Sequence, residues 1–193
     1  MTPEIAAGWS ALIAAVATVI GAVTLVLFFA RGGFWGPLND ASSVVLMLAT
    51  IPVALVIAAI ESESFTTSVL APTAVGIVAM LVVAILQALL VARRVTFEQT
   101  KRPVLLLGAI VGLWYLSVAA FAGHTALDGP LGWLAVVSGV GFIAIGYGFL
   151  AGGERHPLAA TGGIALLVAS TAFLGILGVR LVSGDLVVPD WNV

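Results

Sequence analysis

The segment Leu81–Ala92 reads LVVAILQALLVA and is apolar on every side apart from Gln87. A strand of a membrane β-barrel is about 10 residues long and alternates apolar with polar side chains, a pattern that this segment lacks. The segment belongs to a longer apolar stretch, 69–92. Because a helix needs roughly 20 apolar residues to cross a hydrocarbon layer about 30 Å thick, this stretch predicts a transmembrane helix.

Apolar stretches of similar length recur along the rest of the chain. We expect transmembrane helices at about 6–30, 41–60, 69–92, 104–123, 133–151 and 158–181. The first one follows MTPEI, which lacks the basic residues of a signal peptide, so we expect it to be retained. These spans and the short segments between them leave no room for a separate soluble domain in the 193 residues. The sequence therefore predicts an all-α integral membrane protein, a six-helix bundle in which residues 1–193 form a single polytopic domain.

Composition supports the membrane class and excludes several others. Hydrophobic residues make up 62% of the chain and charged residues 8%, whereas an average soluble domain has about 25% charged residues. The absence of cysteine excludes disulfides, thiolate metal sites, iron–sulfur clusters and thiol nucleophiles. The few basic residues are too scattered for a nucleic-acid interface, so we expect no nucleic-acid partner.

The positions of the basic residues predict the orientation in the membrane. Four of them lie in the polar segment between the third and fourth stretches: Arg93, Arg94, Lys101 and Arg102. Short cytoplasmic loops collect Lys and Arg, so we expect the loop 93–102 to be cytoplasmic in a multi-pass protein of the cell membrane. With six crossings, Arg31 and Arg155 lie on the same side and Arg180 on the other. Both termini are then expected on the outer side.

Two pairs of glycines predict close contacts between helices. Gly108 and Gly112, and likewise Gly148 and Gly152, are spaced four residues apart, and small residues at this spacing let two helix backbones approach. We expect these pairs to pack helices within the chain. A contact between two copies of the chain is the alternative.

The segment Gly32–Asp40, GGFWGPLND, is the most distinctive stretch for function. The first interpretation is structural: Asn39 or Asp40 caps the second helix, where a side-chain oxygen accepts from free backbone N–H groups. The second interpretation is a polar pocket that opens to the cytoplasm. Its candidate ligand-binding residues, all expected near the cytoplasmic ends of helices, are Trp35, Asn39, Asp40, Gln87, Tyr147 and Thr161.

The distribution of the other polar residues argues against metals, cofactors and ion coupling. No charged residue falls at mid-depth, where ion-coupled transporters usually keep one. His124 and His156 are expected on opposite sides of the membrane and cannot ligate one haem, so we expect no cofactor. Acidic residues gather with His124 on the outer side without the spacing of a calcium loop, so we predict no metal site. They are Glu61, Glu63, Asp128, Asp185 and Asp190.

The sequence leaves three functions open, and it contains no motif that names a family. The first is a non-catalytic subunit or helper of a larger membrane assembly, acting through contacts with lipids and with other membrane chains or further copies of itself. The second is a carrier or binding protein for a neutral or lipid-like molecule. The third is a membrane-embedded enzyme in which Asp40, the one candidate catalytic residue, is the acid or base for a lipidic substrate. Catalysis is the less favoured expectation.

Overall fold

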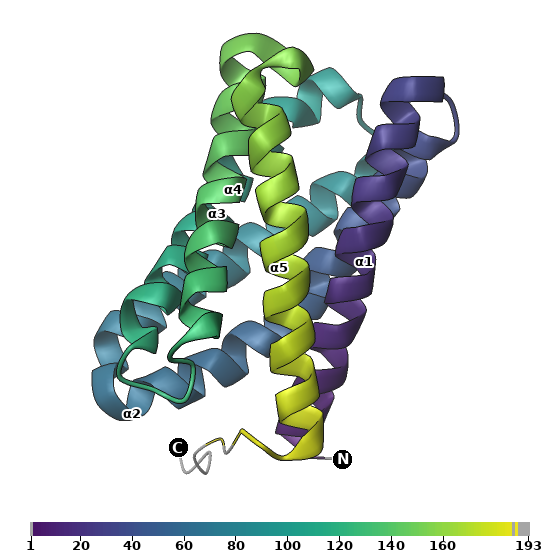
Figure 1. The fold of residues 1–193 in the computed structure, drawn as a ribbon. Helices are drawn as coiled ribbons and strands as arrows, with labels where there is room; N and C mark the ends of the chain where they lie inside the picture. The colour runs from purple at the N-terminus through teal and green to yellow at the C-terminus, as the bar shows by residue number, and fades with distance from the viewer. Residues whose placement is uncertain (1, 187, 189–193) are drawn as a thin grey trace.

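A computed structural model describes residues 2–186 and 188, and within the helices all side chains except those of 63–66 and 154. The described part of the chain is helical (Figure 1). Its elements are α1 (Pro3–Arg31), α2 (Trp35–Val91), α3 (Phe97–Ala122), α4 (Pro130–Gly152), a short 3-10 helix η1 (Gly153–Arg155) and α5 (Pro157–Ser183).

The long helix α2 contains two membrane-crossing segments, Trp35–Ser62 and Thr67–Val91. A straight helix of 57 residues would be about 85 Å long and would hold its ends far apart. Gly36 and Leu90 nevertheless line the same cavity, so α2 reverses direction between the two segments, as its ribbon shows in Figure 1. The described residues therefore hold six helical segments long and apolar enough to cross a membrane, which confirms that part of the fold prediction.

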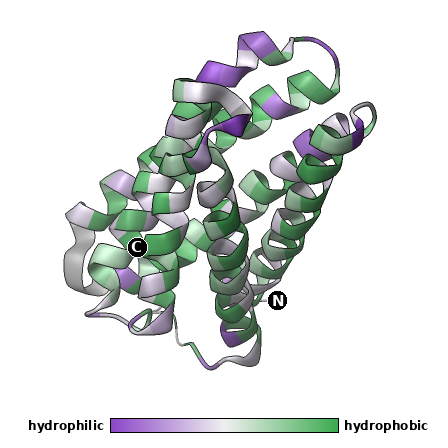
Figure 2. Ribbon diagram, turned by 45° about the horizontal axis from the view of Figure 1, so that its top comes forward, coloured by the Kyte–Doolittle hydropathy of each residue, from purple (hydrophilic) through white to green (hydrophobic). Residues whose placement is uncertain are grey.

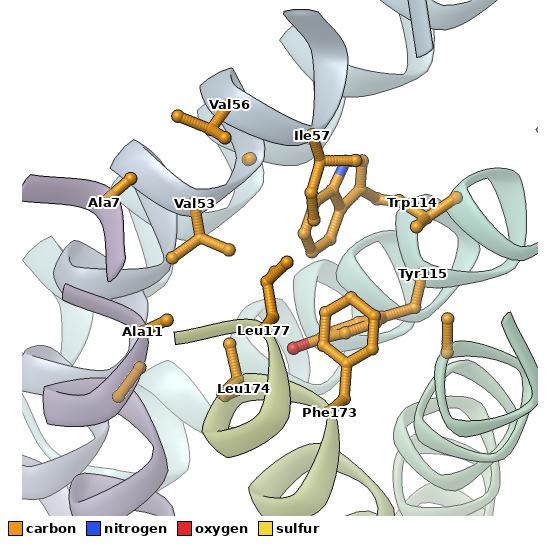
Figure 3. Close-up of a cluster of buried hydrophobic side chains, with 14 of the residues drawn as sticks. Ala7, Ala11, Val53, Val56, Ile57, Trp114, Tyr115, Phe173, Leu174 and Leu177 are labelled. Atoms are coloured by element: carbon orange, nitrogen blue, oxygen red, sulfur yellow. The ribbon is translucent and has the colours of Figure 1, made fainter. Parts of the chain in front are cut away.

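Each helix packs against its neighbours in a closed ring, in the order α1, α2, α3, α4, α5 and back to α1. Large side chains from several helices fill the middle of this ring (Figure 3). Tyr115 of α3 is at its centre, with ring centroids 4.8 Å from Trp114, 5.9 Å from Phe142 and 5.5 Å from Phe173. The phenol oxygen of Tyr115 lies 3.5 Å from Oγ of Ser170. Trp114 and Tyr115 thus pack inside the bundle.

Glycines set the closest helix approaches. Gly112 of α3 faces α4, and a Cβ atom there would lie 2.7 Å from the carbonyl oxygen of Gly139. Gly148 of α4 packs directly against Ala159 of α5. Gly8 of α1 and Gly178 of α5 form a further close contact that the sequence did not indicate. Gly108 is looser than expected, because the nearest atom to its Cβ position, on Phe142, is 3.9 Å away.

The outer surface of the bundle is as apolar as its core. Large aliphatic side chains point outward from every helix, including Val26, Ile85, Leu113, Val140 and Ile164. Figure 2 shows the hydrophilic residues gathered mainly at the ends of the helices. Extensive exposed apolar surface is rare on soluble monomers, and here it continues around the bundle. Together with the six crossing segments, it indicates a multi-pass membrane protein.

The basic residues separate between the two ends of the bundle. Six of the seven belong to the end where α1 meets α2, α2 meets α3 and α4 meets α5: Arg31, Arg93, Arg94, Lys101, Arg102 and Arg155. We call this the basic end. Arg180 lies in the last turn of α5, at the opposite end, where α1 also begins.

Two helix starts differ clearly from the prediction, and one difference corrects the assignment of Asn39 and Asp40. α2 begins at Trp35 rather than near residue 41, with Phe34 in the cap position and no side-chain cap. Asn39 and Asp40 therefore lie in the second turn, beyond the free N–H groups that an N-cap satisfies, and the capping interpretation is wrong. α3 begins at Phe97, where the Thr96 backbone N–H donates to Oε1 of Gln99 at 2.8 Å in a capping box.

Candidate ligand-binding cavity

A cavity of about 820 Å³ opens at the basic end of the bundle. Its walls come from the end of α1, both ends of α2, the first turns of α3 and the end of α4 with η1. This volume is within the range of about 300–1,000 Å³ that is usual for small-molecule sites.

The cavity follows from the way the helices diverge. α1 packs closely on α5 through Gly8 and Gly178 near the opposite end, and the two helices separate toward the basic end (Figure 1). In the described chain α1 packs only against α2 and α5, so no helix contact closes the gap between α1 and α3. Further along the helices the buried core fills the middle of the bundle, and at the basic end the space between the helices remains as the cavity.

Apolar side chains make most of the wall. α1 contributes Leu25, Phe28 and Phe29, and α3 contributes Val104 and Leu105. Phe28 also packs on the start of α2, because Gly36 has no side chain: a Cβ atom at that position would lie 3.0 Å from the Phe28 ring. The inner part of the cavity therefore suits a hydrocarbon chain.

Polar and charged side chains line the same cavity. Lys101 and Arg155 provide two cations, and Asp40 provides one carboxylate. Gln87 lies deeper, and its Oε1 atom is buried without a hydrogen-bond partner among the described residues. A buried amide oxygen is costly to leave unpaired, so a donor on a bound molecule would stabilise this arrangement.

The six residues expected to form a polar pocket divide into two groups. Asn39, Asp40 and Gln87 line the cavity together. The others are not among the lining residues. Trp35 is partly buried and packs on Phe34, with ring centroids 5.4 Å apart. Tyr147 is 60% exposed on the outside of α4, with its ring 6.3 Å from that of His156. Thr161 is exposed, and its hydroxyl donates to the Pro157 carbonyl at 2.9 Å.

Sequence reasoning missed two kinds of lining residue. In the sequence, Lys101 and Arg155 indicate only the orientation in the membrane. The aromatic residues Phe97 and Phe149 also line the cavity, although the sequence places Phe97 in the loop 93–102 and Phe149 simply within an apolar stretch. One signal was available: Phe97, Lys101, Val104 and Leu105 are spaced three and four residues apart, so they share one face of a helix.

The acidic residues expected at the opposite end lie only partly within the described part of the chain. Glu61 is only 1% exposed, and its Oε1 atom has no partner among the described residues. The side chain of Glu63 and the whole of Asp190 lie outside the described residues. Among those described, no three His, Cys, Asp or Glu side chains group as a metal site.

The two histidines are at opposite ends of α4. His124 lies in the turn after α3, and His156 caps α5, where its Nδ1 atom accepts from the Leu158 backbone N–H at 3.3 Å. The length of α4, 23 residues, separates them by roughly 35 Å.

Comparison with protein-family models, with curated proteins and with solved structures found no match for this chain. The class is therefore defined by the fold and the cavity alone: a polytopic α-helical membrane protein with a mainly apolar cavity at one end that also carries charged side chains.

Proposed function

We propose that this protein binds, and as a carrier moves, a lipid-like amphipathic molecule at the basic end of its helix bundle. The observation that carries the proposal is the composition of the cavity. Lys101 and Arg155 line it together with Leu25, Phe28 and Val104, so polar and apolar parts of one ligand each find a matching wall. Binding sites of this kind combine an apolar lining with a few placed polar groups.

We infer that the basic end faces the cytoplasm. Six of the seven basic residues belong to this end, and Lys and Arg concentrate in cytoplasmic loops. The cavity would then take its ligand from the cytoplasmic leaflet or release it there. This orientation also places charged side chains at the depth where lipid headgroups lie.

The cavity changes the order of the three functions that the sequence left open. A subunit or helper acting only through its outer surface needs no internal cavity, so that function receives less support than ligand binding. An enzyme acting on a lipidic substrate is the second candidate. It is favoured by one observation: Asp40 does not cap α2 and lines the cavity with Gln87 instead.

Photolabelling by a lipid probe, with and without a substitution that fills the cavity, tests the proposal. In phosphatidylcholine nanodiscs, a lysophosphatidylcholine with a photoactivatable chain should label peptides from 87–105 and 149–155. Val104→Trp places an indole in the cavity and should remove this labelling. Leu106→Trp is the matched control, because Leu106 lies on the same helix but points outward at 57% exposure. Equal labelling of both variants, or labelling of outward faces alone, would refute ligand binding in the cavity.

A further inference from the structure

The cavity changes in polarity with depth. Lys101 is in the second turn of α3, and Leu105 lies four residues further in, about 6 Å deeper at 1.5 Å per residue. Arg155 lies in η1, beyond the last turn of α4. The two cations are therefore near the mouth, while Val104, Leu105 and Leu25 line the interior. An amphiphile would bind with its headgroup at the mouth and its chain inward.

The two cations have no partner within the described part of the protein. Neither the Lys101 ammonium nor the Arg155 guanidinium forms a hydrogen bond or an ion pair there, although Asp40 lines the same cavity. Both groups carry several N–H donors. The pair therefore offers unused donors and excess positive charge at the level of lipid headgroups.

Gln87 provides a second, independent indication of a ligand. It lines the cavity four residues before the end of α2 at Val91, which places it about 6 Å further in than that end. Its Oε1 atom is buried and has no hydrogen-bond partner among the described residues. An amide oxygen accepts hydrogen bonds, so a ligand that satisfies it presents a hydroxyl or N–H donor below its charged headgroup.

We propose that the ligand is an anionic phospholipid, with its phosphate held between Lys101 and Arg155, a headgroup or backbone hydroxyl donating to Gln87, and its chain along Leu25, Val104 and Leu105. The proposal rests on the proposed function and specifies the ligand's charge. Lys and Arg residues at a membrane surface attract anionic lipids, and phosphate oxygens accept from ammonium and guanidinium groups.

The test compares two lipids that differ in headgroup charge. Wild-type protein in phosphatidylcholine nanodiscs receives trace photoactivatable lysophosphatidylglycerol or lysophosphatidylcholine, and labelled peptides are quantified. We expect the anionic probe to label the cavity peptides roughly 25-fold more, since each of the two cations that line the cavity contributes about fivefold, while solvent screens the charges outside the lining. The double variant Lys101→Gln/Arg155→Gln should lose this preference. The matched control Arg94→Gln/Arg102→Gln removes two charges from the same end but none from the cavity lining, and should keep most of it.

The outcomes separate the two proposals. Equal labelling of the cavity by both probes, unchanged in the double variant, would overturn the anionic ligand and leave the proposed function standing. No cavity labelling by either probe would overturn both. A third arm adds sn-glycerol 3-phosphate. If it competes as well as unlabelled lysophosphatidylglycerol, the ligand is a water-soluble phosphate and the lipid assignment is wrong.

Discussion

Gly112 of α3 and Gly139 of α4 meet backbone to backbone: a Cβ atom on Gly112 would lie 2.7 Å from the Gly139 carbonyl oxygen, and one on Gly139 would lie 2.6 Å from the Gly112 carbonyl oxygen. Gly141 of α4 and Gly162 of α5 repeat this relationship at 3.0 and 2.9 Å. Because lipid offers no hydrophobic driving force between helices, such close packing carries much of the association.

Adjacent glycines in α5 give a matched test of this packing. Gly162→Ala should lower the free energy of unfolding by about 1–3 kcal/mol, the usual cost of overpacking. At Gly163 an added Cβ atom meets nothing within 4 Å, so Gly163→Ala should be neutral or stabilise by about 0.5–1 kcal/mol through helix propensity. Thermal unfolding in one detergent measures both. Equal changes in stability for the two variants would show that the close contact between α4 and α5 does not contribute to the stability of the protein.

Two tryptophans test the aromatic core in the same way. Trp114 is 1% exposed and packs on Tyr115 and Gly76, whereas Trp133 is 73% exposed. Trp114→Ala should cost about 3–5 kcal/mol, the range for a buried aromatic residue. Trp133→Ala should change stability by less than about 0.5 kcal/mol. A small loss of stability in Trp114→Ala would mean that the core in the middle of the helix bundle is loosely packed.

The sequence predicts the presence of the helices better than their ends or rotation. Hydropathy identifies six crossings because the membrane requires a fixed apolar length. It places the starts of the second and fourth crossings too late, since Trp35–Asp40 and Phe97–Arg102 are polar or mixed yet helical. The Thr96–Gln99 capping pattern marks the true start of α3.

Helix rotation explains the divided outcome for the candidate site. Counting along each helix predicts that four candidate residues lie at the same end of the bundle: Asn39, Gln87, Tyr147 and Thr161. Counting does not predict whether a side chain points inward or outward. A helix that is apolar all round has no polar face that would fix its rotation. Tyr147 and Thr161 consequently point outward, while Asn39 and Gln87 line the cavity.

Arg93 adopts a backbone conformation that favours glycine. Its φ is 56°, and it follows α2 in a Schellman motif in which Arg93 N–H donates to Leu90 and Arg94 N–H donates to Leu89, at 3.0 and 2.9 Å. Arg93→Gly should stabilise the protein by about 1 kcal/mol, since the left-handed conformation costs a non-glycine residue about that much. Arg94→Gly is the control and should bring no gain. Thermal unfolding distinguishes the two variants. A loss of stability in Arg93→Gly would show that the left-handed backbone conformation of Arg93 is not strained.

The orientation has a direct test, because the chain contains no cysteine to give background labelling. Glu98→Cys and Asp128→Cys place single thiols at exposed positions on opposite ends of the bundle. If the basic end is cytoplasmic, an impermeant maleimide should label Asp128→Cys in intact cells and Glu98→Cys only after permeabilisation. The reverse pattern would place the cavity on the outer side.

Substitutions of Asp40 distinguish a helix-capping role from a role in lining the cavity. An N-cap replaced by alanine loses about 0.5–2 kcal/mol, because backbone N–H groups lose their acceptor. Asp40 lies in the second turn of α2, where the backbone N–H groups bond within the helix, so Asp40→Ala should change the free energy of unfolding by less than about 0.5 kcal/mol. The same variant should increase labelling of the cavity by the anionic lysophosphatidylglycerol probe, since it removes the one carboxylate in the described lining. Asp40→Asn should match Asp40→Ala in the labelling assay, because both substitutions remove the charge.

The opposite outcome would be a clear loss of stability in Asp40→Ala that is absent in Asp40→Asn, with labelling unchanged in both variants. Asp40 would then have a structural role, and the observation that favours catalysis in this cavity would be lost.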